Sequence, residues 1–102
     1  MTAQLLLGVD VDPVDLLAEH KATIRRAIMR DAVDHSGTIS SNRVRHALDG
    51  RGIPPRLVGQ VYRAMVREGL IAKAGHETSD DHKGGNGGRL IPMYLVTAVG
   101  AA

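Results

Sequence analysis

The strongest constraint on the fold comes from residues 55–68, PRLVGQVYRAMVRE, which directly follow another proline at Pro54. Proline suits the first position of a helix, because the N–H that it lacks would have no partner there. Apolar side chains then recur at the spacing of one helix face, at Val58, Val61, Tyr62 and Met65. Gly69 follows and predicts the end of the helix. The stretch therefore predicts an amphipathic helix over residues 55–68 with one side packed in a core.

The opposite side of this helix is basic. Three guanidinium groups and one amide recur along it without an intervening acid, at Arg56, Gln60, Arg63 and Arg67. Arg and Gln side chains bind phosphates and read guanine and adenine edges in a major groove. A solvated helix face has a similar composition, so this helix alone predicts either a solvent-facing or a nucleic-acid-facing surface.

The charge distribution favours the second interpretation. The net charge is only +2, and residues 1–19 hold four acids without any Lys or Arg. Residues 20–76 instead hold eleven Lys or Arg against four acids. A basic middle behind an acidic start indicates a polyanionic partner for the middle of the chain.

Length and composition exclude several other classes of protein. One hundred and two residues suit a single domain, and the absence of Cys excludes disulfides and thiolate metal sites. The chain has no apolar run of the roughly 20 residues that span a membrane, and its start lacks the basic residues of a signal peptide. No phosphate-binding glycine loop or nucleophile elbow is present. We therefore expect a cytoplasmic protein with no membrane partner, no enzymatic activity and no cofactor.

Two more helices are predicted before residue 55. Asp12, Pro13 and Asp15 form a helix start, and Gly37 sets the end of a first helix over residues 12–36. Its expected core face is Val14, Leu17, Ala18, Ile24, Ile28 and Ala32, with a possible break near His20, where Lys21 interrupts that face. Residues 38–40 are expected to be an extended linker. Ser40 or Ser41 then caps a second helix over residues 40–49, with Val44, Ala47 and Leu48 in the core.

Residues 70–97 predict a hairpin. Residues 70–74 and 89–97 have the composition of strands, and the glycine-rich residues 75–88 between them predict a long loop. Pro92 cannot donate a ladder hydrogen bond, so its side of the strand has to be an edge or a bulge. The loop contains possible metal ligands, namely His76, Glu77, Asp80, Asp81 and His82. Without Cys or a regular spacing we expect a solvated, mobile loop and no metal.

Residues 1–11 precede the domain as an arm rich in Leu and Val. The sequence permits a short strand, packing on the domain, or a contact with a second copy of the chain. We favour a homodimer through residues 1–17, because exposed apolar segments often mark partner surfaces.

The predicted order over residues 12–100, three helices followed by a hairpin, resembles the winged helix-turn-helix family. The ending Tyr94-Leu95-Val96-Thr97-Ala98-Val99-Gly100 is similar to the Tyr-x-Leu-Thr-x-x-Gly ending of the wing in MarR- and PadR-type regulators. The predicted fold is therefore mainly α with a small β-hairpin (α+β), a three-helix winged helix-turn-helix with a long wing loop.

The resemblance implies that the third helix, over residues 55–68, enters a major groove while the wing contacts the neighbouring backbone. Besides Arg56, Gln60, Arg63 and Arg67, the expected DNA contacts are Ser41, Arg43 and Arg45 of the second helix and Lys73, Lys83 and Arg89 of the wing. The expected function is sequence-specific binding of double-stranded DNA in transcriptional regulation. The composition is typical of a high-GC genome, and the small size suggests a bacteriophage or another mobile element.

Two alternatives remain at this point. The first is a DNA-architectural, replication, excision or packaging accessory protein, which would use the same basic face. The second is a winged helix that binds another protein, since one fold serves several functions.

Overall fold

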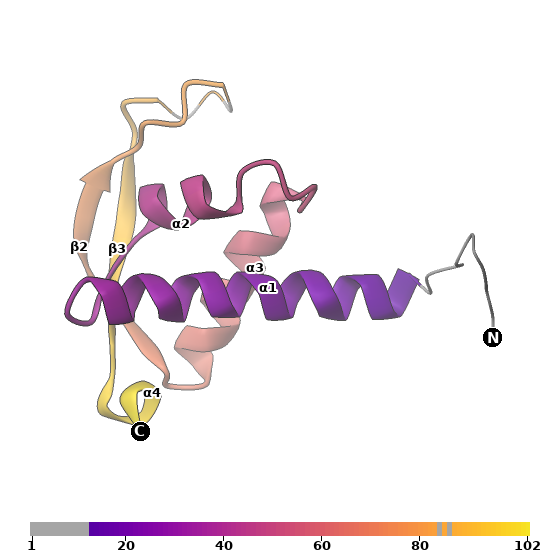
Figure 1. Cartoon of the computed structure of the whole chain (residues 1–102). Helices are drawn as coiled ribbons and strands as arrows, with labels where there is room; N and C mark the ends of the chain where they lie inside the picture. Colours follow the sequence, from indigo (N-terminus) through magenta and orange to yellow (C-terminus); the bar gives the residue numbers. More distant parts are fainter. Residues whose placement is uncertain (1–12, 84, 86) are drawn as a thin grey trace.

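The computed structural model of the chain describes residues 13–83, 85 and 87–102. It has an α+β fold with a long N-terminal helix, two more helices, a three-stranded antiparallel sheet in the order β1-β3-β2, and a short C-terminal turn of helix (Figure 1). The elements are α1 (Pro13–Asp34), β1 (Thr38–Ser40), α2 (Ser41–Leu48), α3 (Pro55–Arg67), β2 (Ile71–Thr78), β3 (Leu90–Val96) and α4 (Ala98–Ala101). The arm over residues 1–11 lies outside the described residues.

The order of elements differs from three helices followed directly by a hairpin. Residues 38–40 are not a linker, because they form β1, which pairs with β3 and places Ile39 opposite Tyr94. Ile39 is completely buried, and the strand pairing satisfies its backbone groups inside the domain. A segment of three residues is too short to show a periodicity, so the sequence could not reveal this strand.

Strand β2 is also longer than predicted, since it continues through Thr78 and includes residues 75–78 that we assigned to the loop. The pairing with β3 shifts register between Lys73 and His76, and Gly75 lies in this irregularity with a φ of +86°. Glycine adopts that angle without strain, which allows the strand to continue beyond the bulge. Pro92 pairs opposite His76 beside this bulge, and β1 pairs only with residues 93–95. The prediction that Pro92 lies at an edge or a bulge is therefore confirmed.

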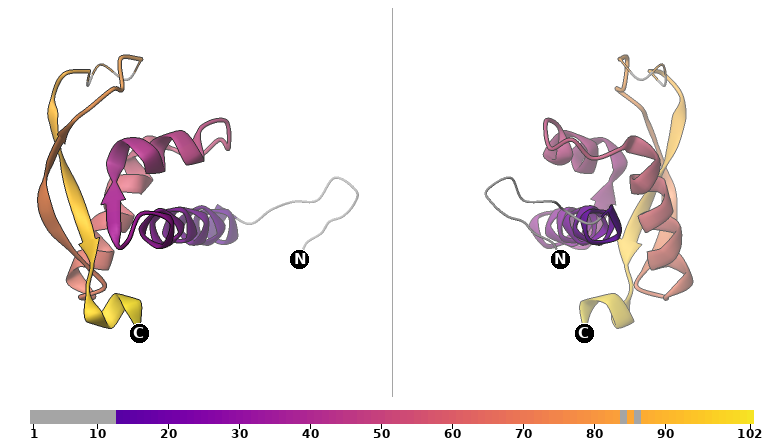
Figure 2. Two further views of the ribbon diagram at one scale, coloured as in Figure 1. Left: turned by 60° about the vertical axis from the view of Figure 1, so that its left-hand side comes forward. Right: turned by 90° about the vertical axis from the view of Figure 1, so that its right-hand side faces the viewer.

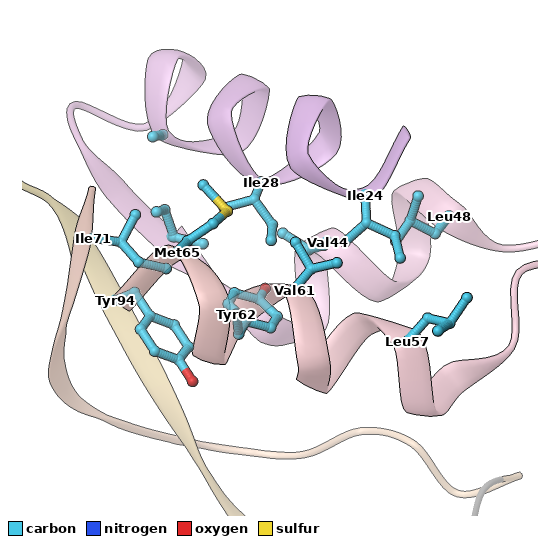
Figure 3. Close-up of a cluster of buried hydrophobic side chains, with 12 residues drawn as sticks. Ile24, Ile28, Val44, Leu48, Leu57, Val61, Tyr62, Met65, Ile71 and Tyr94 are labelled. Carbon is cyan, nitrogen blue, oxygen red and sulfur yellow. The ribbon is translucent and has the colours of Figure 1, made fainter. Parts of the chain in front are cut away.

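The core lies where α1, α2 and α3 meet the sheet, and its side chains converge from all of these elements (Figure 3). Val61 and Met65 retain only 2% and 1% exposure, which confirms that they lie near its centre. The predicted face of α3 is correct except that Leu57 is buried and Val58 only partly so. The rings of Tyr62 and Tyr94 stack with centroids 4.6 Å apart, which joins α3 to β3. The aliphatic core thus fixes the rotation of α3.

Helix α1 is continuous over residues 13–34, without a break near His20. Its second half packs in the core through Ile24, Ile28 and Ala32. The predicted core face is wrong for the first turns, where Val14 and Leu17 are 72% and 39% exposed. The reason is geometric, because these turns project beyond the elements on which the rest of α1 packs (Figures 1 and 2).

The predicted helix ends are confirmed. Ser40 is the N-cap of α2, and its Oγ accepts a hydrogen bond from the Arg43 N–H at 3.2 Å. Pro55 is the first residue of α3, and Gly69 ends that helix with a φ of +77°. The Leu70 N–H then donates back to the Met65 carbonyl at 3.0 Å, which closes the last turn.

The chain end packs against the corner between α3 and β2. The Thr97 hydroxyl donates to the Leu70 carbonyl at 3.1 Å and accepts from the Gly100 N–H at 3.0 Å. A Cβ at Gly100 would lie 2.1 Å from the Leu70 carbonyl oxygen, so only glycine fits this approach. The ending that resembles a wing terminus therefore has a direct structural role in this chain.

Candidate nucleic-acid interface

The outer face of α3 carries the four side chains predicted to contact DNA. Arg56, Gln60, Arg63 and Arg67 are all exposed. Their direction follows from the core, because the buried side chains of the same helix occupy the opposite side. The prediction that these residues share one exposed face of the helix is therefore confirmed. We refer to these four residues as the α3 stripe.

The three arginines of the α3 stripe differ in their pairing from four other arginines of the chain. Within the part of the chain that the structure describes, none of the three forms an ion pair, whereas four arginines elsewhere do so, namely Arg25, Arg30, Arg43 and Arg45. The nearest acid in sequence, Glu68, is bound to Arg25 of α1 through two hydrogen bonds of 2.8 Å. The stripe thus presents to solvent three arginines that form no ion pair among the described residues.

The Arg25–Glu68 pair fixes α1 against the end of α3. The hydrogen bonds to Arg25 hold the pKa of the Glu68 carboxyl below its usual range, and the same bonds raise the pKa of Arg25. Both side chains are more than a third exposed, so the pair sets geometry more than it adds stability.

A hollow of about 260 Å³ lies between α1 and α3 beside the stripe. Val61 and Ala64 contribute to its wall, and its polar lining comes from Lys21, Arg25, Gln60, Arg63 and Arg67. The structure therefore brings three members of the α3 stripe together with two cations of α1 that sequence reasoning had not assigned to the interface. Their spacing of four residues on α1 was visible, but the crossing of α1 over α3 was not.

A second hollow, of about 320 Å³, lies between α1 and α2. Its charged lining is mixed, with Arg26, Arg30 and Arg51 beside Asp31 and Asp34. Arg30 and Asp34 form an ion pair of 3.1 Å across one turn of α1. Two acids thus lie among the arginines of this hollow, whereas no acid among the described residues lines the hollow beside the stripe.

The predicted contacts on α2 are bound within the protein. Arg43 donates to both carboxylate oxygens of Asp31, at 2.9 and 3.1 Å, and these bonds raise its pKa. Asp31 is buried and also accepts from the Ser40 N–H at 2.9 Å. The Ser41 hydroxyl donates to the Pro92 carbonyl at 2.8 Å. Ser41 and Arg43 therefore link α2 to α1 and to β3.

Arg45, the third predicted contact on α2, is paired with the loop between β2 and β3. It forms an ion pair with Asp80, and Asp80 also accepts from His46 at 3.0 Å. The Asp80 N–H donates to the Asn42 amide oxygen at 3.1 Å. These bonds hold the first part of the loop against α2.

Glu77 makes a further connection that sequence reasoning missed, because we had placed it in a free loop. Its carboxylate accepts from the Ser40 hydroxyl and the Ser41 N–H at 2.7 Å each, and from the Asn42 amide at 3.1 Å. A carboxylate at this position compensates the positive end of α2. The sequence signal for this role was absent, since thirty-odd residues separate the partners.

The predicted wing cations, Lys73, Lys83 and Arg89, are all exposed. Lys73 lies on β2 opposite Tyr94, while Lys83 and Arg89 lie in the segment between the two long strands. They are distributed over the strand and the loop and do not line the hollow beside the stripe. Among the residues that the structure describes, no three His, Cys, Asp or Glu side chains are grouped as metal ligands would be.

Comparisons with other proteins give no further guide to function. No protein family, no curated protein and no solved structure matched this chain. Over residues 13–102, apart from the two that are not described, none of the helices has the length and apolar character needed to cross a membrane.

Proposed function

We propose that this chain is a winged-helix protein that binds double-stranded DNA, with α3 as the helix that enters the major groove. The single observation that carries the proposal is the α3 stripe, which places Arg56, Arg63 and Arg67 on one exposed face without an ion pair among the described residues. A phosphate backbone supplies the negative charge that this face lacks, and base edges supply acceptors for its guanidinium groups.

The arrangement of the other elements supports this proposal. Helices α2 and α3 are joined by a turn, and the β2–β3 pair follows with the loop that would act as a wing. β1 adds a third strand to the sheet of this wing. The bonds from Glu77 and Asp80 to α2 hold the base of the wing at a fixed place relative to the helices. A rigid base is what a wing needs to contact a backbone while α3 occupies the adjacent groove.

A regulator and a DNA accessory protein would use the same α3 face. The positive charge of this face argues against a module that binds other proteins. We favour a sequence-specific regulator, because the stripe combines arginines with Gln60, whose amide pairs with adenine edges. Selection of bound sites from a random duplex pool tests this choice. Enrichment of one motif supports a regulator, and equal recovery of all sequences supports an accessory protein.

The double variant Arg63→Ala/Arg67→Ala tests the binding face directly. We expect its affinity for duplex DNA to fall, by about 1–3 kcal/mol for each arginine that contacts a base, and the salt dependence to weaken by nearly one unit of slope for each lost phosphate contact. Its thermal midpoint should hardly change, because both side chains are exposed.

The matched control is Arg26→Ala/Arg51→Ala, which removes the same charge from the hollow between α1 and α2. Fluorescence anisotropy with a labelled duplex measures both variants over a range of salt. Equal affinity of the stripe variant and the control would remove α3 from the proposed interface.

A further inference from the structure

The hollow between α1 and α3 is lined, within the part of the chain that the structure describes, by several cationic side chains and by no acidic side chain. Four cations line it, two from each helix, namely Lys21, Arg25, Arg63 and Arg67. Among the described residues, the one acid that forms an ion pair with any of them is Glu68, which pairs with Arg25. Like charges brought together on a protein surface repel one another unless an anion is bound between them.

The donors in this hollow are available for such an anion. Arg25 uses Nη1 and Nη2 for one bond each to Glu68, which leaves three of its five N–H groups. Lys21 is half-buried and forms no ion pair within the described part of the chain. The Gln60 amide, which also lines the hollow, adds two neutral donors. Charged and neutral donors that converge from two sides are the means by which proteins hold a phosphate group.

The hollow between α1 and α2 shows that this charge is not a general property of α1. Arg26 and Arg30 are on the same helix but face Asp31 and Asp34, one of them through an ion pair. Over the described residues, the hollow on the side of α1 that faces α3 has no acid in its lining, whereas two acids line the hollow on the other side. The excess therefore follows the α3 stripe and not the composition of α1.

We propose that Lys21 and Arg25 of α1, with Gln60, Arg63 and Arg67 of α3, form a binding site for backbone phosphates of the DNA strand beside the groove that α3 enters. This inference rests on the proposed function, and it adds α1 to the interface as a second wall. Helix α1 crosses α3 and projects past it, so a DNA strand beside α3 would pass α1 where the two helices cross (Figures 1 and 2). Glu68 positions the Arg25 guanidinium and limits the charge of the site.

The test compares Lys21→Gln with Arg26→Gln, which remove one charge from opposite flanks of the same helix. Anisotropy titrations of a random-sequence duplex over a range of salt measure both variants and the wild-type chain. For Lys21→Gln we expect affinity to fall about three- to tenfold and the slope of log affinity against log salt to weaken by about 0.9. For Arg26→Gln both values should stay at those of the wild-type chain.

Glu68→Gln gives a change in the opposite direction, because it removes the negative charge and one of the two oxygens that accept from Arg25. We expect its affinity for the duplex to rise about two- to fivefold. Inorganic phosphate should compete only weakly at equal ionic strength, since a free phosphate offers one anionic group and the strand offers several. Strong competition by inorganic phosphate would instead assign the hollow to a free anion and overturn the inference.

The failure of this inference and of the proposed function are distinguishable. If Lys21→Gln and Arg26→Gln bind alike while Arg63→Ala/Arg67→Ala binds weakly, α1 is not part of the interface and α3 remains so. If the wild-type chain does not bind duplex DNA with a salt-dependent affinity, the proposed function fails, and the phosphate site fails with it.

Discussion

Replacing Glu77 with alanine tests how the sheet is attached to α2. The Glu77 carboxylate accepts three hydrogen bonds from consecutive residues at the start of α2, two of them 2.7 Å long and one of 3.1 Å. Hydrogen bonds to a charged group contribute about 1.5–3 kcal/mol each when buried. Because this site is only half-buried and its bonds form one network, we expect a total loss of about 2–3 kcal/mol for Glu77→Ala.

A loss of this size is large for a small domain. At about 4–8 °C per kcal/mol for a domain of 60–100 residues, the thermal midpoint should fall by roughly 10–20 °C. Glu77→Gln keeps one acceptor oxygen without the charge, so its midpoint should lie between those of Glu77→Ala and the wild-type chain. Thermal unfolding followed by circular dichroism measures all three proteins.

The control for this measurement is Glu19→Ala, because Glu19 is exposed on the projecting part of α1 and forms no ion pair in the described part of the chain. It should change the midpoint by no more than about 2–3 °C, as surface substitutions usually do. If Glu77→Ala matches this control, the carboxylate does not hold α2 and β2 together, and the reasoning about a fixed wing base is wrong.

Three further predictions concern the core, the tyrosines and the chain start. Met65→Ala should destabilise the fold by about 2–5 kcal/mol in urea unfolding, because Met65 is 1% exposed, and a change below about 1 kcal/mol would contradict its central place. Burial raises the pKa of both Tyr62 and Tyr94, and the nearby Ser41 hydroxyl opposes this rise only in part at Tyr62. The folded state therefore binds these protons more tightly than the unfolded state, so their contribution to stability is complete below pH 10 and is lost as pH rises above it. Phenolate absorbance should appear together with alkaline unfolding, and ionisation of both rings near pH 10 in the folded protein would refute this. Finally, we expect a homodimer through residues 1–17, of which the described part exposes Leu16 and Leu17 at 44% and 39%. Analytical ultracentrifugation should show a dimer that Leu16→Glu/Leu17→Glu dissociates, and a monomeric wild-type chain at high micromolar concentration would exclude it.

The sequence predicted α3 well because its signals were local. The apolar spacing around Val61 and Met65 defined the buried side, and the α3 stripe followed as the other side. Pro55 and Gly69 defined its ends, since each acts through its own backbone geometry. Interactions within one helical segment can be read from one segment of sequence.

The parts that were missed depend on distant partners. β1 requires the pairing of Ile39 with Tyr94 on β3, which no pattern within three residues can show. Arg43 and Arg45 had the composition of DNA contacts, yet the fold brings Asp31 and Asp80 to them as ion-pair partners. The tertiary structure decides which acid pairs with each arginine, because any carboxylate within reach can form the ion pair.

The hollow between α1 and α3 is another feature that the sequence alone could not predict. In the sequence, Lys21 interrupts the predicted core face of the first helix. The structure shows that it lines the cationic hollow between α1 and α3. Only the crossing of α1 and α3 brings it near Arg63. The charge asymmetry of the chain predicts a polyanionic partner, and the fold suggests where on the surface this partner would bind.

The most direct test of the central claim, that duplex DNA is bound by the outer face of α3, is a nuclear magnetic resonance titration. A duplex of two helical turns, carrying a motif recovered by selection, is added to isotope-labelled protein. We expect the largest shifts at the Nε–H groups of Arg56, Arg63 and Arg67 and at the amides of α3, with smaller shifts at Lys21 and Arg25. Shifts that instead centre on α4 or on the exposed face of β3 around Leu95, or no shifts at any residue, would contradict the account.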